Sequence, residues 1–201
     1  MPNWDEDSPR LRTNFAQILK VIYHAAERRE TPTLESSKRW HEIIMSGLSV
    51  PDPRLVGSFR GEPGLEHLQA RVGTRLAVSA EIVAEELTEF EKKTQKLVSY
   101  LDAMLPAGDK PARDQLSAIL DISAWIHSEW IRIHPFANGN GRIARIWANS
   151  IAVRYGLPPF LRFRPRPGIG YVEASMKAMQ GDWKPTAVAF RQMLDDFMKH
   201  H

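Results

Sequence analysis

The chain has 201 residues, of which 43% are hydrophobic and 25% are charged, with a formal net charge of +3. This length allows one domain with a substantial apolar core, and the composition is not that of a disordered, collagen-like or coiled-coil chain. No run approaches the roughly 20 apolar residues of a membrane span, so we expect no membrane association and a cytoplasmic location. Because there is no cysteine, a disulfide framework, a thiolate metal site and a cysteine nucleophile are excluded.

Apolar residues recur at helical spacing almost throughout, so the chain is predicted to be mostly α-helical. The first helix is predicted over about residues 11–29, and Pro32 ends the linker that follows it. Thr33 can cap a second helix, which is predicted to stop at Gly47. Glu35 then lies in the first turn of that helix, where the helix dipole accounts for an acidic residue.

Residues 50–78 are rich in proline and glycine, which predicts a loop with a small hairpin. Ser79 can cap the next helix, which is predicted to run to about Met104. Asp109 and Pro111 stand in the order expected of a cap and a first turn, and are predicted to open a further helix. Because that helix is apolar on nearly every side, we expect it to be central and buried.

The last helices are bounded by glycine and proline. One is predicted to begin at about residue 141 and to end at Gly156 and Pro158. Two shorter helices are predicted over about residues 170–179 and 185–198.

The segment between Glu129 and Glu173 contains no Asp or Glu but many arginines. They are Arg132, Arg142, Arg145, Arg154, Arg162, Arg164 and Arg166. Such a run is often a solvated basic surface, but the glycine-rich motif within it favours an anionic ligand. Aromatic residues that could stack on bases are not interleaved with these arginines, so nucleic acid is not expected as a partner.

The glycine-rich motif, His134-Pro-Phe-Ala-Asn-Gly-Asn-Gly-Arg142, joins the two most apolar helices. Its glycines fall at the N-terminus of the second helix, where unpaired N–H groups and the helix dipole favour an anion. Arg142, Arg145 and Asn149 are spaced by three and four residues and should share one helix face. Two guanidinium groups there can hold a polyphosphate, although pairing with acidic residues of other helices is the structural alternative.

His134 is the one side chain near this anion loop whose ordinary pKa, about 6.5, lies close to neutrality. It can take a proton from an attacking hydroxyl. A packed structural histidine is the alternative, and the adjacent anion loop favours the base. The other internal histidines lack such a setting and are predicted to be structural or surface residues: His24, His41, His67 and His127.

The run from His134 to Arg145 resembles the Fic family signature, H-P-F-x-[D/E]-G-N-G-R-x-x-R. Outside it, Gly57-Ser-Phe-Arg60 is similar to the family's G-x-[YF]-R element. Tyr171 and Gly181-Asp182 resemble its C-terminal elements. The similarity covers about residues 35–195 of what we expect to be a single Fic-like domain over residues 1–201.

The resemblance implies an all-α Fic fold, a compact bundle of about seven or eight helices with a small β-hairpin flap. It also implies transfer of AMP from ATP to a Tyr, Thr or Ser hydroxyl of a target protein, with His134 as the base. Gly139, Asn140 and Gly141 would form the anion hole, and Arg142 and Arg145 would grip the triphosphate. The flap would align the target segment by strand addition. Its residues would be Leu65, Glu66, His67, Leu68, Gln69, Ala70, Arg71 and Val72.

The sequence departs from the signature at Asn138, where the family usually has an acidic residue that binds Mg²⁺. An amide oxygen can ligate the ion but carries no negative charge, so the ion would depend more on the nucleotide's phosphates. The resemblance also implies an inhibitory helix in many members. Glu35 matches its pattern only partly, and we expect inhibition to come from a separate, antitoxin-like protein.

Two other functions remain open. One is an enzyme of the same fold that uses another nucleotide or transfers a phosphoryl group. Kinase-like relatives resemble H-x-F-x-x-x-N-K-R, and Gly141 stands where that pattern has Lys. The other is an inactive binding module, which the intact His134, Arg142 and Arg145 disfavour.

Overall fold

The computed structural model describes residues 8–165 and 167–200. Within these residues, seven α-helices and one two-stranded hairpin confirm the predicted all-α class. The helices are α1 (Pro9–Glu27), α2 (Leu34–Met45), α3 (Val83–Met104), α4 (Arg113–Ile133), α5 (Asn140–Arg154), α6 (Ile169–Ala178) and α7 (Lys184–His200). The hairpin pairs β1 (Arg71–Val72) with β2 (Arg75–Leu76) in antiparallel register, and short 3-10 helices cover Pro53–Leu55 and Ala80–Ile82.

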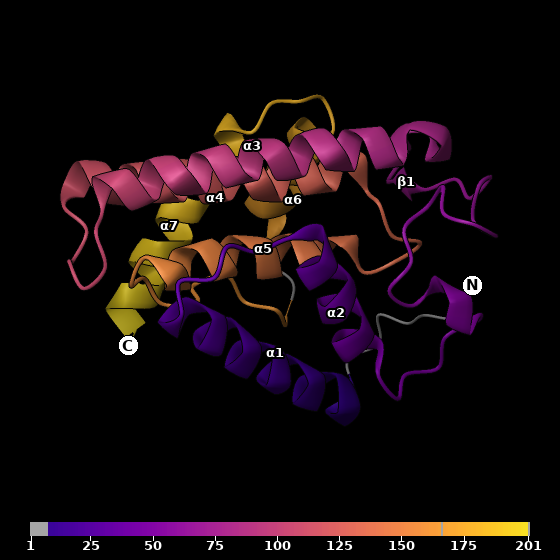
Figure 1. Ribbon diagram of the computed structural model, residues 1–201, viewed down its shortest axis with the longest axis horizontal. Coiled ribbons are helices and arrows are strands. Elements are labelled where there is room, and N and C mark those ends of the chain that lie inside the picture. The colour runs from indigo at the N-terminus through magenta and orange to yellow at the C-terminus, as the bar shows by residue number, and fades with distance from the viewer. Residues whose placement is uncertain (1–7, 166, 201) are drawn as a thin grey trace.

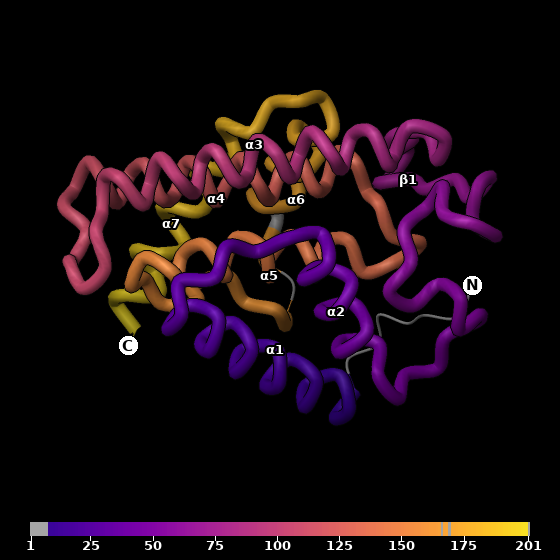
Figure 2. Tube along the Cα trace, in the orientation of Figure 1, coloured from indigo at the N-terminus to yellow at the C-terminus, as the bar shows by residue number. Residues whose placement is uncertain are grey.

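Helix α5 is the centre of the fold. It packs against α1, α2 and α4, and the tube in Figure 2 shows it between α1 and the α3–α4 pair. Every residue from Arg142 to Arg154 is buried. Helices α6 and α7 pack against α4, whereas the chain between α2 and α3 gathers at one end of the molecule (Figure 1).

Aromatic side chains form much of the main core. Trp147 of α5 meets Trp40, Phe90 and Trp130 at centroid distances of 5.2, 5.3 and 5.7 Å. Phe136 of the motif is fully buried and packs on Trp130 at 5.9 Å. Phe136 therefore anchors the motif loop in the aromatic core, where large ring side chains contribute much of the buried apolar surface.

The ends of the helices confirm one predicted cap and correct another. Thr33 caps α2, where its hydroxyl accepts a hydrogen bond from Ser36 N–H at 3.2 Å. The prediction that Asp109 and Pro111 open α4 is wrong, because the helix begins at Arg113. There the Gln115 side chain accepts from Ala112 N–H at 2.7 Å and donates to Met104 O at 2.6 Å. One amide thus caps α4 and ties it to the end of α3.

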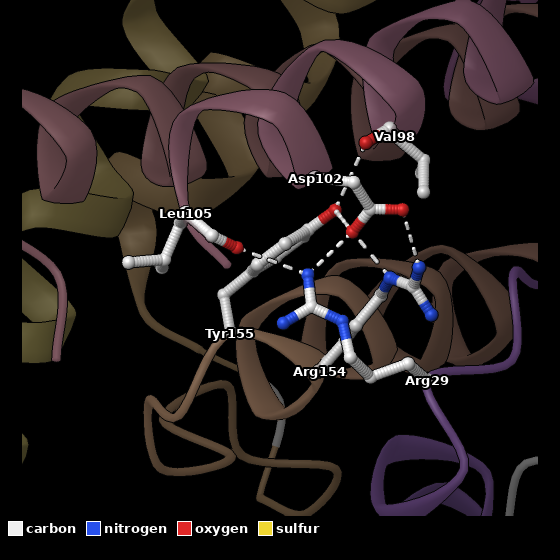
Figure 3. Close-up of polar contacts among 6 residues, drawn as sticks. All are labelled: Arg29, Val98, Asp102, Leu105, Arg154 and Tyr155. Atoms are coloured by element: carbon white, nitrogen blue, oxygen red, sulfur yellow. Dashed lines mark hydrogen bonds and ion pairs between the residues drawn. The ribbon is translucent and has the colours of Figure 1, made fainter. Parts of the chain in front are cut away.

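A polar cluster around Asp102 joins α3 to the end of α5 and to Arg29, which follows α1 (Figure 3). The Asp102 carboxylate accepts from Arg29 at 2.5 Å, Arg154 at 2.7 Å and the Tyr155 hydroxyl at 3.0 Å. The Arg154 side chain is only 4% exposed. Burial opposes the charge on Asp102, but these hydrogen bonds outweigh it and lower the pKa of the carboxyl below its ordinary value.

Asp102→Asn should lower the free energy of unfolding by about 2 kcal/mol, because it leaves the buried Arg154 guanidinium without its carboxylate; partial exposure of the cluster reduces the usual cost. Since folding lowers the pKa of Asp102, its contribution is complete above the unfolded pKa near 3.8 and is lost as the pH falls through the lower folded value. Urea unfolding at pH 7 and pH 3 tests both statements. The exposed Asp195→Asn is the matched control, and equal losses for the two variants would contradict the prediction.

Candidate active site

The motif loop starts with an unusual turn at His134. This residue ends α4 with a left-handed backbone (φ 53°), and its N–H donates to Trp130 O at 2.9 Å. Asn140 closes the loop: its amide donates to Phe136 O at 2.8 Å and accepts from Phe136 N–H at 2.9 Å. Because the Asn140 side chain is used in this clamp, only its backbone N–H is available to a ligand.

Gly139 is required at the start of α5. Its φ is +80°, which side chains rarely adopt, and an added Cβ would lie 2.9 Å from Met45 Cε and 3.4 Å from His41 Nε2. The chain therefore comes close to α2 at this point. Gly139 and the first residues of α5, Asn140 and Gly141, also line a cavity.

His41 of α2 supports the loop from beneath. Its ring stacks on Phe136 at 4.0 Å, its Nδ1 accepts from Gly57 N–H at 3.0 Å, and its Nε2 lies 3.1 Å from Asn138 O. Burial, together with the charge of Arg142, lowers the pKa of His41 to about 3. His41 is therefore a neutral structural residue, as expected, but its position under the motif was not predicted.

Arg60, from the second element that resembles the family, joins the loop to the hairpin region. Its side chain is 1% exposed, and its backbone N–H donates to Pro135 O at 2.7 Å. The guanidinium donates to the carbonyls of His134 at 2.8 Å, Ile133 at 2.9 Å, Val78 at 2.8 Å and Leu68 at 3.2 Å. The buried Arg60 guanidinium therefore ties the motif to both sides of the hairpin, a role that the sequence did not reveal.

The His134 side chain faces a cavity with one ring nitrogen ready to accept a proton. Its Nδ1 lies 3.2 Å from Ile131 O, and a carbonyl can only accept, so Nδ1 carries the hydrogen and Nε2 is the free base. Burial and the charge of Arg60 lower the pKa of His134 to about 4, well below the 6.5 assumed from the sequence. The imidazole is therefore neutral at pH 7.

The cavity has a volume of about 430 Å³ and is lined by all the residues predicted to act in catalysis, nucleotide binding and metal binding. These are His134, Asn138, Gly139, Asn140, Gly141, Arg142 and Arg145. Its other walls come from the hairpin, from Arg164 and from the face of α6 that carries Tyr171 and Ser175.

Only part of the predicted flap belongs to the hairpin and to this cavity. Arg71 and Val72 form β1 and line the cavity, whereas residues 65–70 form the preceding loop and are not among its lining residues. Leu65 and Ala70 are buried. Ala77 N–H donates to Ala70 O at 3.0 Å next to the paired strands, and Leu68 O, further back in the loop, accepts from Arg60 at 3.2 Å.

Arg145 is held by a chain of buried polar groups. Its guanidinium, 4% exposed, donates to the Tyr171 hydroxyl at 3.2 Å and to Phe163 O at 3.3 Å. The Tyr171 hydroxyl lies 2.6 Å from His127 Nε2. Since arginine only donates, the tyrosine proton points to His127, whose pKa is lowered to about 3 by burial and by Arg145. His127 is therefore structural, as predicted, and helps to orient Arg145.

Three other polar residues of the basic segment have structural partners. Arg132 forms ion pairs with Glu129 and Glu86, and Arg154 pairs with Asp102. Asn149, expected on the ligand-binding face, instead bonds both backbone groups of Leu161 at 2.8 and 3.0 Å. Arg166 lies outside the described residues. Tertiary pairing thus explains part of this segment, and the cavity explains Arg142, Arg145 and Arg164.

The sequence model of the Fic/DOC family matches residues 31–152, so the chain belongs to the Fic/DOC family. It is 40% identical over 67 residues to protein adenylyltransferase Fic of Nematostella vectensis, covering 33% of this chain and 15% of that protein. It is 29% identical over 127 residues to protein adenylyltransferase fic-1 of Caenorhabditis briggsae, covering 62% and 22%. The chain thus spans less than a quarter of the length of either relative.

Solved structures show the same fold. Fic-1 from C. elegans has a TM-score of 0.61 at 21% identity, with 100% of this chain and 52% of that chain covered. The BepC protein from Bartonella tribocorum, solved with bound AMPPNP, has a TM-score of 0.60 at 15% identity, with 95% of this chain and 90% of that chain covered.

Among residues 8–165 and 167–200, no helix combines the length and the apolar character needed to cross a membrane.

Proposed function

We propose that this chain transfers AMP from ATP to a hydroxyl side chain of a target protein. The observation that carries the proposal is the single cavity that joins the unprotonated Nε2 of His134, the N-terminus of α5 and the guanidinium groups of Arg142 and Arg145. The relatives named as protein adenylyltransferases support AMP as the transferred group.

In this mechanism the target hydroxyl oxygen attacks the α-phosphorus of ATP. The new O–P bond forms as the bond from that phosphorus to the bridging oxygen of the β-phosphate breaks, and pyrophosphate leaves. Nε2 of His134 takes the hydroxyl proton. The N–H groups at the start of α5 stabilise the charge on the α-phosphate, and Arg142 and Arg145 hold the departing phosphates.

The short hairpin is the proposed guide for the target segment. Arg71 and Val72 lie at the cavity wall, so a strand added to β1 would bring its hydroxyl side chain towards His134. In the preceding loop, Ala70 O still accepts from Ala77 N–H across the hairpin, and Leu68 O ties the loop to Arg60.

The residues present do not fit a magnesium ion that the protein itself holds. Magnesium is usually bound through one or two carboxylates together with substrate phosphates. The described residues that line the cavity include no Asp or Glu, and Asn138 Oδ1 already accepts from Gly139 N–H at 2.5 Å. No step of the mechanism above therefore passes through a metal ion.

Inhibition is proposed to come from outside the described segment, for example from an antitoxin-like protein. Glu35, which partly matches the inhibitory pattern of the family, lies in the first turn of α2 behind the Thr33 cap. Its place in a core helix leaves it no freedom to reach Arg145.

Two forms of labelled ATP test the proposed activity in a lysate. AMP transfer would attach a label carried on the α-phosphate, and phosphoryl transfer would attach one carried on the γ-phosphate. Mass spectrometry of the labelled proteins then gives the added group and the modified side chain. Incorporation of γ-label alone would establish a phosphoryl transferase, and absence of both labels would favour a binding module.

Tyr171→Phe should weaken ATP binding by about fivefold, the value of one net hydrogen bond of about 1 kcal/mol, because Arg145 loses its orienting partner. AMP binding should change much less, since Arg145 is assigned to the distal phosphates. Calorimetric titration with both nucleotides measures the difference, with the exposed Tyr100→Phe as control. A uniform loss for ATP and AMP would show that Tyr171 shapes the pocket without acting through Arg145.

A further inference from the structure

We propose that the cavity binds the triphosphate of ATP without a metal ion, and that arginine side chains supply the charge compensation. This inference rests on the proposed function because it takes ATP as the ligand. It concerns the form in which ATP binds, a property that the transfer reaction does not itself determine.

The charges at the cavity wall all have one sign. Arginines reach it from three separate parts of the fold: Arg71 from β1, Arg142 and Arg145 from α5, and Arg164 from the segment that follows α5. Among the described residues that line the cavity there is no carboxylate. A divalent cation entering this wall would therefore meet like charges, whereas a free triphosphate would meet opposite charges on several sides.

Burial removes the guanidinium groups of Arg142 and Arg145 from water, so an anion in the cavity would interact with them strongly. Arg142 and Arg145 are 3% and 4% exposed. Arg145 donates to a tyrosine hydroxyl and to a backbone carbonyl, and neither carries a charge that could offset its own. A desolvated cation with neutral partners is costly, and an anionic ligand reduces that cost.

The loop itself is arranged for an anion. Asn138 Oδ1 accepts from Gly139 N–H at 2.5 Å, so the amide is turned onto its own backbone. The N–H groups of Asn140 and Gly141 belong to the first turn of α5, ahead of the first intrahelical bonds, which Arg142 and Ile143 N–H make to Gly139 O. Asn140 and Gly141 both line the cavity, so these two N–H groups can donate to an anion but cannot ligate a cation.

Calorimetric titration of the intact chain with ATP, once in excess chelator and once in excess Mg²⁺, tests the inference. We expect ATP to bind in chelator at least as tightly as with Mg²⁺, where a difference of less than about threefold counts as equal affinity. Binding at least tenfold tighter with Mg²⁺ would overturn the inference and leave the proposed AMP transfer intact. Absence of ATP binding under both conditions would instead remove the proposed donor, and the inference with it.

Two variants locate the effect. Asn138→Asp adds an uncompensated carboxylate beside the phosphates, so it should weaken ATP binding in chelator by about tenfold or more and make binding respond to Mg²⁺. Arg164→Ala should weaken binding in chelator by more than it weakens binding with Mg²⁺. The exposed Arg162, which lies in the same basic segment but does not line this cavity, provides the control variant Arg162→Ala. If Asn138→Asp leaves both affinities unchanged, the amide does not face the phosphates and the inference is wrong.

Discussion

Replacing His134 with alanine should reduce AMP transfer by about 10²–10⁴-fold, the usual contribution of a positioned base. ATP binding should persist, because the start of α5 and both motif arginines remain. Folding should persist too, since the loop is held by the backbone carbonyls that Arg60 binds and by the Asn140 clamp. Transfer is measured with α-labelled ATP and ATP affinity by calorimetry, with the exposed His24→Ala as control.

The pH profile of transfer separates a buried base of lowered pKa from an unperturbed histidine. Burial lowers the pKa of His134 to about 4, so Nε2 stays unprotonated above that value and transfer should not decline between pH 8 and pH 5. Transfer should fall only as the pH approaches 4, because His134 is then protonated by solvent and can no longer accept the proton of the target hydroxyl. An unperturbed histidine would lose activity near pH 6.5, and that outcome would contradict the structural environment described for His134.

Arg145→Ala should weaken ATP binding by about 30-fold or more, since truncating one partner of a buried charged contact costs about 2 kcal/mol or more. The effect is large because Arg145 is 4% exposed and already desolvated. AMP should lose far less, because it lacks the distal phosphates assigned to this guanidinium.

The same titration on Arg162→Ala controls for the loss of one positive charge from the basic segment, because Arg162 is exposed and lies outside the cavity. Equal losses of ATP and AMP affinity in Arg145→Ala would show that Arg145 only supports Tyr171 and Phe163. That outcome would leave Arg142 as the one motif arginine assigned to the phosphates.

The difference between Arg145 and its neighbours along the chain could not be read from charge alone. Arg132 and Arg154 are as basic as Arg142 and Arg145, yet they pair with carboxylates that lie on α3 and within α4. Glu86 and Asp102 are distant in sequence from the arginines that they bind. A local count of acidic residues therefore overstated how much of the basic segment is available to a ligand.

The amino-acid sequence by itself determined the local features of this protein. Helical periodicity predicted the all-α class, Thr33 predicted the start of α2, and the glycine motif predicted the helix terminus at the start of α5. Each of these follows from residues close together in the chain, whose spacing and backbone preferences act without help from distant elements.

Only the tertiary structure decided how the site is supported and tuned. His41, Arg60 and His127 reach the motif loop or the Tyr171–Arg145 pair through packing of elements far apart in sequence. No local pattern marks the two histidines, and the element that contains Arg60 does not show which carbonyls it binds. The pKa of His134 falls because folding buries the imidazole near Arg60. The Asn149 side chain is not available to a ligand because it is hydrogen-bonded to the backbone of Leu161. Burial and long-range hydrogen bonds exist only once the chain is folded, which is why the sequence predicted the residues that line the cavity but not the contacts that position them.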